Sequence, residues 1–359
     1  MTQTFRQTLK SGLLGAAFVL GAGSIASAQI TITYAEGGPN RGTRSGAVQD
    51  FADTVKRLTD GEVEVDIHWG GALVSLTATP QAVRDGVADA GTVLGSYDPS
   101  RLAGFFVGDL PTQYSDPWVI MRAMYELMTT NETQIQMLAD QNLVYLGNFT
   151  TTGLNFECNG TNKIESIADF AGKKIRASGT YAKVLNDLGA TTMNMGFQDV
   201  YQALDTGLID CTTGYFYTAA AYKTFEVANH FSIAQWGGIG SFGIMMNKQE
   251  FDDFSAEHQQ AFLDAGSEMI DRFARAQIEE MVTIRAGLES GEIGRQVTVF
   301  DFPAEDLLKM EELGNVHNQD WVEQINAMGH DGQAMFDEYR ALLAKYDAER
   351  EELGYPWQR

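Results

Sequence analysis

The sequence predicts an α/β protein of two similar lobes that face one another across a cleft. A phrase is written twice, as QAVRDGVADA at 81–90 and as QALDTGLIDC at 202–211, which indicates two related units. Over 30–94, strand-like and helix-like apolar spacing alternate, and this order favours parallel strands covered by helices. No linker rich in Pro, Gly and Ser separates the halves, so crossing strands and one long helix should join them as a hinge.

Residues 1–28 are interpreted as a secretory signal peptide. Arg6 and Lys10 precede the apolar run LLGAAFVLGAGSIA, which closes on the small-residue site ASA, so the mature chain should begin at Gln29. A membrane-spanning helix is the alternative, but the run is short and rich in glycine and alanine. We therefore expect a periplasmic protein with no direct insertion into the membrane.

The elements of the first lobe follow from the spacing of apolar residues. The expected order is strand, helix, strand, helix and strand, at 30–35, 45–58, 62–69, 79–85 and 87–94. Gly86 follows the second helix, where a left-handed residue commonly ends a helix. This order gives the first of the two α/β units.

The repeated phrase marks a helix-to-strand junction in each unit. A short helix carries Gln-Ala and an aliphatic residue inward, a glycine ends it, and an apolar pair leads through aspartate into the next strand, at 86–89 and 207–210. Chance similarity between two ordinary junctions is the alternative. The preceding segments also match, since IHWGGAL and TTMNMGF each contain a strand and a glycine-containing loop. Loops at the carboxyl ends of parallel strands would line the cleft.

A long helix is predicted from an N-cap at Ser255 to the neighbourhood of Gly291. Its apolar face carries Phe262, Met269, Phe273 and Met281, and further helices follow Pro303. This helix is long enough to span both lobes. The expected domains are 29–153 with about 242–281 for the first lobe, and 154–241 with about 282–359 for the second.

Composition limits the chemistry. The formal net charge is −23, so the protein should repel nucleic acid, and an anionic ligand would need local positive charge. Two cysteines and five scattered histidines offer no recognisable metal-ligand spacing, and neither a metal nor a cofactor is expected. In an exported chain, Cys158 and Cys211 are expected to form a disulfide, with two buried thiols as the alternative.

Four segments in this order resemble the extracytoplasmic solute receptors of TRAP (tripartite ATP-independent periplasmic) transporters. They are WGGAL with QAVRDGVADA, DFAGKKIRASG at 169–179, LGATTMNMGFQDVYQALDTGLIDC at 188–211, and MMNKQEFDDFSAEHQQAFLDA at 245–265. The resemblance runs over nearly the whole mature chain. It implies the bilobed fold of periplasmic binding proteins, closing on a small organic anion that is delivered to membrane permease subunits.

The resemblance also implies that Arg176, in the GKKIR motif, pairs with a ligand carboxylate. A guanidinium offers two parallel donors to a carboxylate and stays charged. Without the family context, Arg176 would be interpreted as a surface residue at a strand end. Many relatives carry a second arginine on the strand at 153–159, which here reads GLNFECN, so Asn155 or Phe156 would face the ligand instead.

Aromatic residues stand where relatives carry charged or amide groups. This exchange favours a monocarboxylate with an apolar or ring-shaped body, stacked on Phe156, Tyr215, Phe216 and Trp236. Core packing is the alternative for each of the four. Tyr97 matches Tyr215 through the repeat. Glu36, at the end of the first strand, would meet a ligand amine or hydroxyl, or it is a solvated loop acid.

Two other functions compete with the solute receptor. A periplasmic hydrolase or isomerase would use the same cleft, but no nucleophile and base occur at catalytic spacing, so the chain is not expected to be an enzyme. An accessory protein of a sensor would bind the ligand without feeding a permease.

Overall fold

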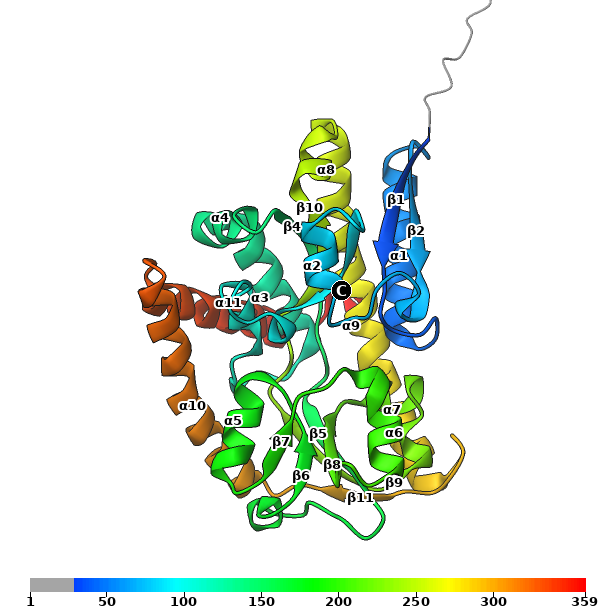
Figure 1. Cartoon of the computed structure of the whole chain (residues 1–359), viewed down its shortest axis with the longest axis vertical. Helices are drawn as coiled ribbons and strands as arrows, with labels where there is room; N and C mark the ends of the chain where they lie inside the picture. Colours follow the sequence, from blue (N-terminus) through cyan, green and yellow to red (C-terminus); the bar gives the residue numbers. More distant parts are fainter. Residues whose placement is uncertain (1–28) are drawn as a thin grey trace, which may run out of the picture.

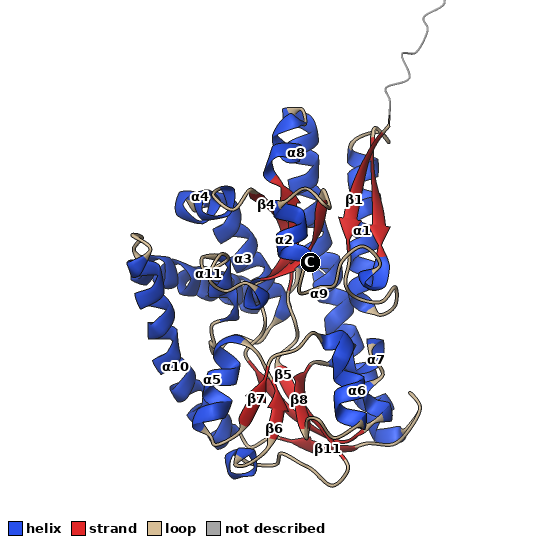
Figure 2. Cartoon of the chain, viewed as in Figure 1, coloured by secondary structure: helices blue, strands red, loops and turns tan. Residues whose placement is uncertain are grey.

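The computed structural model describes residues 29–359, which form two α/β lobes stacked along the long axis of the molecule (Figure 1). The predicted signal peptide lies outside the described residues. Each lobe has its own sheet, and the two groups of strands are separate in Figure 2. This arrangement confirms the predicted bilobed α/β fold. No helix between residues 29 and 359 has the length and apolarity needed to cross a membrane.

The first sheet has the strand order β2-β1-β3-β10-β4. Its strands are β1 (Ile30–Ala35), β2 (Val63–His68), β3 (Ala90–Leu94), β4 (Leu143–Phe149) and β10 (Phe242–Asn247). The helices that contact these strands are α1 (Thr43–Leu58), α2 (Thr79–Arg84), α3 (Pro117–Thr130), α4 (Glu132–Ala139) and α8 (Lys248–Asp253). The predicted start of the third strand at 87 is wrong, because residues 86–89 form a loop and Val87 is 57% exposed.

The second sheet has the strand order β11-β9-β5-β8-β6-β7. Its strands are β5 (Leu154–Asn159), β6 (Lys174–Arg176), β7 (Thr191–Met193), β8 (Cys211–Gly214), β9 (Ala228–Trp236) and β11 (Thr298–Asp301). Three helices accompany it, namely α5 (Gly179–Asp187), α6 (Val200–Asp205) and α7 (Phe216–Ala221).

The expectation of parallel strands holds for β1, β2 and β3 and for β6, β7 and β8. Two strands for which the sequence predicted no direction run the other way: β10 is antiparallel to β3 and β4, and β5 is antiparallel to β8 and β9. These two are the first strands after the chain passes from one lobe to the other. A strand that enters from the cleft side runs away from the cleft, opposite to the strands whose carboxyl ends face it.

The repeated phrase has the same geometry in both lobes. Gly86 and Gly207, which follow α2 and α6, both have φ of 70°. The Asp89 carboxylate accepts from Thr33 N at 2.7 Å, and the Asp210 carboxylate accepts from Lys174 N at 2.8 Å. Each aspartate therefore ties its loop to the neighbouring parallel strand, which explains why both copies of the repeated phrase have an aspartate just before the strand.

The long helix α9 (Ala256–Ser290) spans both lobes, as predicted. Ser255 Oγ accepts from His258 N at its start, and Gly291 ends it with φ of 83°. The helix contacts α1 and β4 of the first lobe and α7 and β11 of the second (Figure 1). It therefore links the lobes alongside the strands.

The crossing segments 150–153 and 237–241 form the hinge. Thr150 Oγ1 donates to Ile239 O at 2.9 Å, and Ile239 N donates to Thr151 Oγ1 at 3.0 Å. Small residues are required here, since a Cβ on Gly238 would lie 2.8 Å from Ile120 Cδ1 and one on Gly240 would lie 2.7 Å from Gly108 O. The two segments pass in direct contact.

The last two helices serve different lobes. Helix α10 (Ala304–Ala327) packs on α5, whereas α11 (Gly332–Leu353) packs on α3 of the first lobe. The sequence-based boundaries placed all of 282–359 in the second lobe. We propose instead that α11 be grouped with the first lobe.

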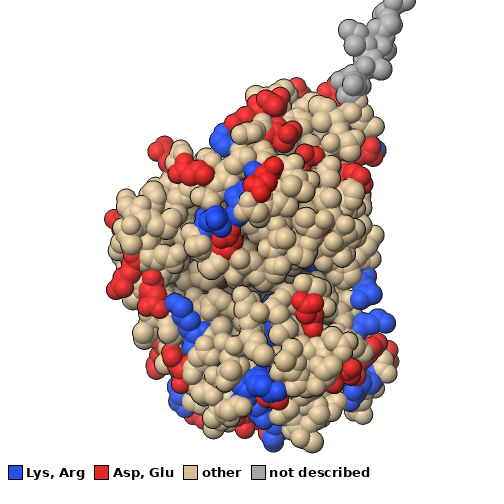
Figure 3. All heavy atoms as spheres, in the orientation of Figure 1, with Lys and Arg blue, Asp and Glu red and all other residues tan. Residues whose placement is uncertain are grey.

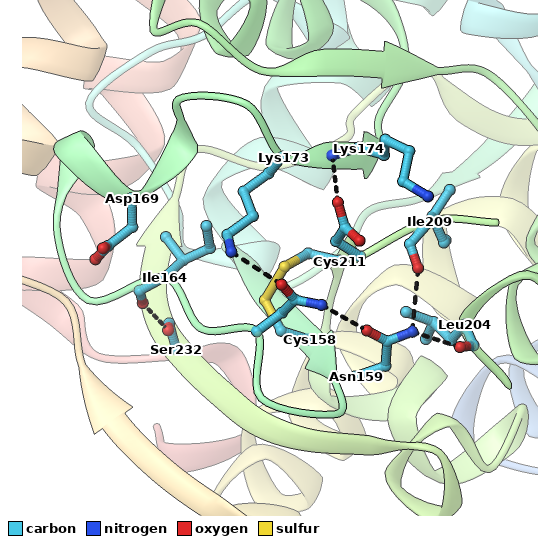
Figure 4. Close-up of a disulfide and its surroundings, with 12 residues drawn as sticks. Cys158, Asn159, Ile164, Asp169, Lys173, Lys174, Leu204, Ile209, Cys211 and Ser232 are labelled. Carbon is cyan, nitrogen blue, oxygen red and sulfur yellow. Dashed lines mark hydrogen bonds between the residues drawn. A yellow bond between two sulfur atoms is a disulfide. The ribbon is translucent and has the colours of Figure 1, made fainter. Parts of the chain in front are cut away.

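Cys158 and Cys211 form a disulfide, which confirms that prediction. The bridge joins β5 to the adjacent strand β8, across 53 positions of sequence. Figure 4 shows Asn159 beside it, donating to Leu204 O and Ile209 O. The disulfide thus fixes the centre of the second sheet and the end of α6.

Candidate functional site

A small cavity lies between the two lobes, with walls from both. The first lobe contributes Arg44, Leu76, Leu94, Tyr97 and Phe242, and the second contributes Phe197, Tyr215, Tyr217, Thr218 and Tyr222. The space in it that is open to a water-sized sphere is about 10 Å³, room for about one water molecule, so the side chains nearly fill the gap between the lobes in this structure. A ligand can enter only if the lobes move apart or the lining side chains shift. Six of its ten lining residues are aromatic.

Two residues of the aromatic wall come from the loops that the repeat predicts. Tyr97 lies three residues after β3, and Tyr215 lies directly after β8. The Tyr215 ring centroid is 5.0 Å from that of Tyr217 and 5.8 Å from that of Phe197. These contacts create an apolar surface against which a flat or apolar group packs.

Arg176 ends β6 behind this wall and is 6% exposed. Its guanidinium carbon lies 4.9 Å from the centroid of the Phe197 ring, and its Nε donates to Met195 O at 3.1 Å. Among residues 29–359, no carboxylate oxygen lies within 4.0 Å of its side-chain nitrogens. A buried positive charge without an anionic partner is costly, so this position favours a bound anion.

Arg44, on α1, is the second buried cation at the cavity, but it is paired. Its Nη1 donates to Glu36 Oε1 at 2.7 Å, and both residues are buried. Its guanidinium carbon also lies 5.2 Å from the centroid of the Phe242 ring. Burial opposes ionisation of Arg44, but Glu36, Tyr222 and Tyr217 together outweigh this effect and raise the pKa of Arg44. Arg44 therefore keeps its charge, and Glu36 stands beside it as its ion-pair partner.

Three tyrosines of the wall, Tyr215, Tyr217 and Tyr222, are neutral hydrogen-bonding groups. Burial raises the pKa of Tyr215 well above its usual value, although Arg176 and Arg44 each act to lower it. Burial likewise raises the pKa values of Tyr217 and Tyr222. At physiological pH, these phenols can donate or accept a hydrogen bond without contributing charge.

The structure brings only some of the predicted site residues to the cavity. Tyr97 and Tyr215 line it, and Arg176 contacts its wall through Phe197. Glu36 stands behind Arg44, not in the wall. Asn155 Oδ1 accepts from Ala234 N at 3.0 Å, so this side chain binds the neighbouring strand β9.

Three predicted aromatic residues lie outside the cavity wall, in packed clusters. Phe156 meets Phe170 with ring centroids 5.0 Å apart, and Phe216 stacks on Phe231 at 5.7 Å. Trp236 meets Tyr181 edge to face at 4.8 Å. All three are at most 1% exposed, so their positions agree with the core-packing alternative.

Of the ten residues that line the cavity, the sequence predicted Tyr97 and Tyr215 and missed the other eight. Tyr217 and Tyr222 belong to the same YFYTAAAY run as Tyr215, and this concentration of tyrosine was an available signal. Arg44 stands in the basic loop after the first strand of a very acidic chain, which was a second signal. Nothing in the sequence pattern pointed to Phe242, which reaches the cavity from the returning strand β10.

A larger hollow of about 410 Å³ lies between α10 and α11. Its charged lining residues are Glu311, Asp337 and Arg340, so acidic groups outnumber basic ones. The cavity between the lobes is therefore the better candidate for an anion.

Two lobes, two crossing segments and a cavity between the lobes are typical of a bilobed ligand-binding protein. Residues 35–324 match the family model of bacterial extracellular solute-binding proteins, family 7 (DctP), and the chain belongs to this family. Proteins of the family bind solutes for transport. The resemblance to TRAP solute receptors is thereby confirmed.

Individual relatives are distant. The C4-dicarboxylate-binding periplasmic protein DctP of Rhodobacter capsulatus is 26% identical over 230 residues, which cover 62% of this chain and 66% of that protein. A TRAP solute-binding protein from a marine metagenome, specific for aromatic acids and solved with 3-hydroxybenzoate, has a TM-score of 0.78. It is 23% identical, and the match covers 89% of this chain and 100% of that one.

A TRAP solute-binding protein of Rhodoferax ferrireducens, solved with copurified benzoate, has a TM-score of 0.77 at 20% identity. The match covers 89% of this chain and 99% of that one. At these identities, the two solved structures establish the fold.

Proposed function

We propose that this protein is the periplasmic receptor of a TRAP transporter, binding a small monocarboxylate with a ring-shaped or apolar body. The ligand would lie between the lobes and pass from there to membrane permease subunits. One observation carries the proposal, namely a buried guanidinium at Arg176 that has no carboxylate partner beside an aromatic cavity.

The chemistry of the wall supports this ligand class. A ligand carboxylate would supply the anion that Arg176 lacks, with two parallel hydrogen bonds to the guanidinium. The rings of Phe197, Tyr215 and Tyr217 would then cover the apolar part of the ligand. Proteins of the same fold that were solved with 3-hydroxybenzoate and with benzoate make ring-shaped acids the first compounds to test.

Calorimetry on protein freed of ligand by unfolding and refolding tests the proposal. Benzoate and 3-hydroxybenzoate should bind, whereas benzamide, which has the same shape without the charge, should bind at least 100-fold more weakly. Equal affinity for acid and amide would remove the charge of Arg176 from recognition. Failure of every monocarboxylate in a panel of aromatic and aliphatic acids would reject the ligand class.

The enzyme alternative is tested on the same samples. Each bound acid, released by denaturation after prolonged incubation, should be recovered unchanged by mass spectrometry. A new product that accumulates with time would identify an enzyme. A gene neighbourhood without membrane subunits would favour the accessory protein of a sensor.

A further inference from the structure

We propose that the Glu36–Arg44 pair sets the charge of the ligand. It makes the cavity accept a monocarboxylate that carries a neutral oxygen at its far end, such as a hydroxyl or carbonyl, and reject a dicarboxylate. This inference rests on the proposed function and narrows its substrate class. In it, Glu36 is a positioning residue that acts on the ligand through Arg44.

Two buried guanidinium groups near the cavity differ in whether a carboxylate of the protein neutralises them. Arg44 comes from the first lobe and Arg176 from the second, and each is 6% exposed. Both lie close enough to the Tyr215 hydroxyl to act on its ionisation. Arg44 has a carboxylate at 2.7 Å, whereas Arg176 has none among the described residues. One guanidinium therefore lines the cavity and the other stands behind its wall, and together they carry only one unit of uncompensated positive charge.

The Glu36 carboxylate is held firmly in place. Besides Arg44, it accepts from Gly38 N at 2.5 Å and from Thr92 Oγ1 at 2.6 Å, and the Tyr34 hydroxyl is 2.7 Å from Thr92 Oγ1. Glu36 itself is 1% exposed. With three donors around a buried carboxylate, the side chain cannot turn away to make room for a second anion.

This arrangement discriminates by charge and not by shape. A ligand carboxylate on Arg176 neutralises the single free charge. A second carboxylate at Arg44 would approach a guanidinium that is already neutralised, and it would meet the Glu36 charge in a poorly screened site. A neutral oxygen does not meet this repulsion, and a guanidinium with five N–H donors still has donors to offer after one bond to Glu36.

Glu36→Gln tests the inference, because it keeps the size of the side chain and removes its charge. The probes are two matched pairs, 3-hydroxybenzoate with isophthalate and 4-hydroxybutanoate with succinate. In the unmodified protein, the monocarboxylate of at least one pair should bind, and its dicarboxylate should bind at least 100-fold more weakly. In Glu36→Gln, this ratio should fall at least tenfold, because the dicarboxylate binds more tightly.

Glu64→Gln is the matched control, since it removes an exposed acidic charge of the same lobe and should leave the ratio unchanged. A monocarboxylate that binds with the same ratio in Glu36→Gln would overturn this inference and leave the proposed function standing. No binding of any monocarboxylate to the unmodified protein would overturn both. If Glu36→Gln does not fold, the unmodified protein still decides, because equal affinity for the members of a pair contradicts the inference.

Discussion

At the scale of single residues, two buried arginines of the same exposure have different roles because of their neighbours. Arg44 is neutralised by Glu36, whereas Arg176 has only a carbonyl oxygen and an aromatic ring beside it. An anionic group of a ligand would supply the partner that Arg176 lacks within the protein. The lack of an internal carboxylate is therefore the feature that distinguishes a ligand-binding cation from a structural one.

Replacing Arg176 with alanine should weaken the binding of carboxylates by about 3–5 kcal/mol, because one partner of a buried charge pair is left alone. Arg176→Lys should also bind poorly, since an ammonium cannot donate two parallel bonds. Calorimetry with the tightest-binding acid measures both effects. Lys183→Ala, at an exposed ion pair on α5, is the control, and near-native affinity in Arg176→Ala would exclude this residue from the site.

Glu157, buried on β5, should make the protein less stable as the pH rises. Burial raises its pKa to about 7, and the hydrogen bond from Thr224 only partly opposes this. Between the usual glutamate pKa of 4.5 and pH 7, the unfolded chain ionises while the folded protein stays protonated. Stability is therefore lost over this range, by about 3 kcal/mol at most.

Urea unfolding at pH 5 and pH 8 measures this effect. Glu157→Gln should resemble the unmodified protein at pH 5 and be more stable at pH 8. Some slope should persist, because burial also raises the pKa values of Asp109 and Glu280 to about 7. Exposed Glu323→Gln is the control, and an unchanged slope in Glu157→Gln would contradict the prediction.

The sequence predicted individual site residues only where position along the chain determines position in space. Tyr97 and Tyr215 follow equivalent strands of a repeat, so both were found. Phe156 and Phe216 could not be assigned, because apolar spacing does not tell whether an aromatic ring faces the cleft or the core. The role of Arg44 depends on Glu36, and this pairing arises only once α1 has folded back on β1.

At the scale of elements, local sequence patterns determine where helices and strands form. The direction of β5 and β10 depends instead on the passage of the chain from one lobe to the other. The bounds of α9 were predicted closely, because an N-cap serine and a left-handed glycine mark its two ends. The reversed directions of β5 and β10 were not predicted. They depend on which lobe the chain has just left, and this is a property of the whole path and not of the segment.

Removing the disulfide with Cys158→Ala and Cys211→Ala together should lower the free energy of unfolding by about 3–4 kcal/mol, as expected for a loop of this length. Ligand affinity should stay close to that of the unmodified protein, since neither cysteine lines the cavity. Urea unfolding and calorimetry measure the two effects. Quantitative thiol labelling of oxidised, unfolded protein would contradict the bridge itself.

Two helical glycines should respond to alanine in opposite directions. A Cβ on Gly266, in α9, would lie 1.8 Å from Leu146 O, so the helix must move away from β4 at a cost of about 1–3 kcal/mol. Gly46, in α1, has no atom within 4 Å of that position, and alanine there should stabilise by about 0.5–1 kcal/mol. Thermal unfolding compares the pair, and equal shifts would show that helix propensity alone decides.

At the scale of the whole molecule, the net charge and the contacts between the lobes both affect the binding of an anion. Figure 3 shows acidic and basic side chains mixed on the drawn face of both lobes, but the formal net charge of the chain is −23, so an approaching anion meets an unfavourable field before it reaches Arg176. The lobes are also in contact outside the cavity. Arg41, on the first lobe, donates to the carbonyl of Ala221 at the end of α7.

Arg41→Ala should weaken the binding of every ligand by a similar factor, about 3- to 10-fold, because it removes a charged hydrogen bond made in the closed form. Calorimetry with several acids measures the factor. Arg101→Ala is the control, since Arg101 pairs with Asp98 in its own lobe. A loss confined to one ligand would show that Arg41 touches the ligand and does not act through closure.

The two crossing segments at the hinge, which contain several glycines, are distinct from the residues that would recognise the ligand. None of the residues at 150–153 or 237–241 lines the cavity, so the pivot and the ligand-contacting wall are built from different parts of the sequence. Substitutions in the cavity wall can therefore change which compound binds without altering the segments about which the lobes would move. This independence makes the chain a practical starting point for an engineered biosensor, with reporter dyes on the outer rims and a redesigned interior.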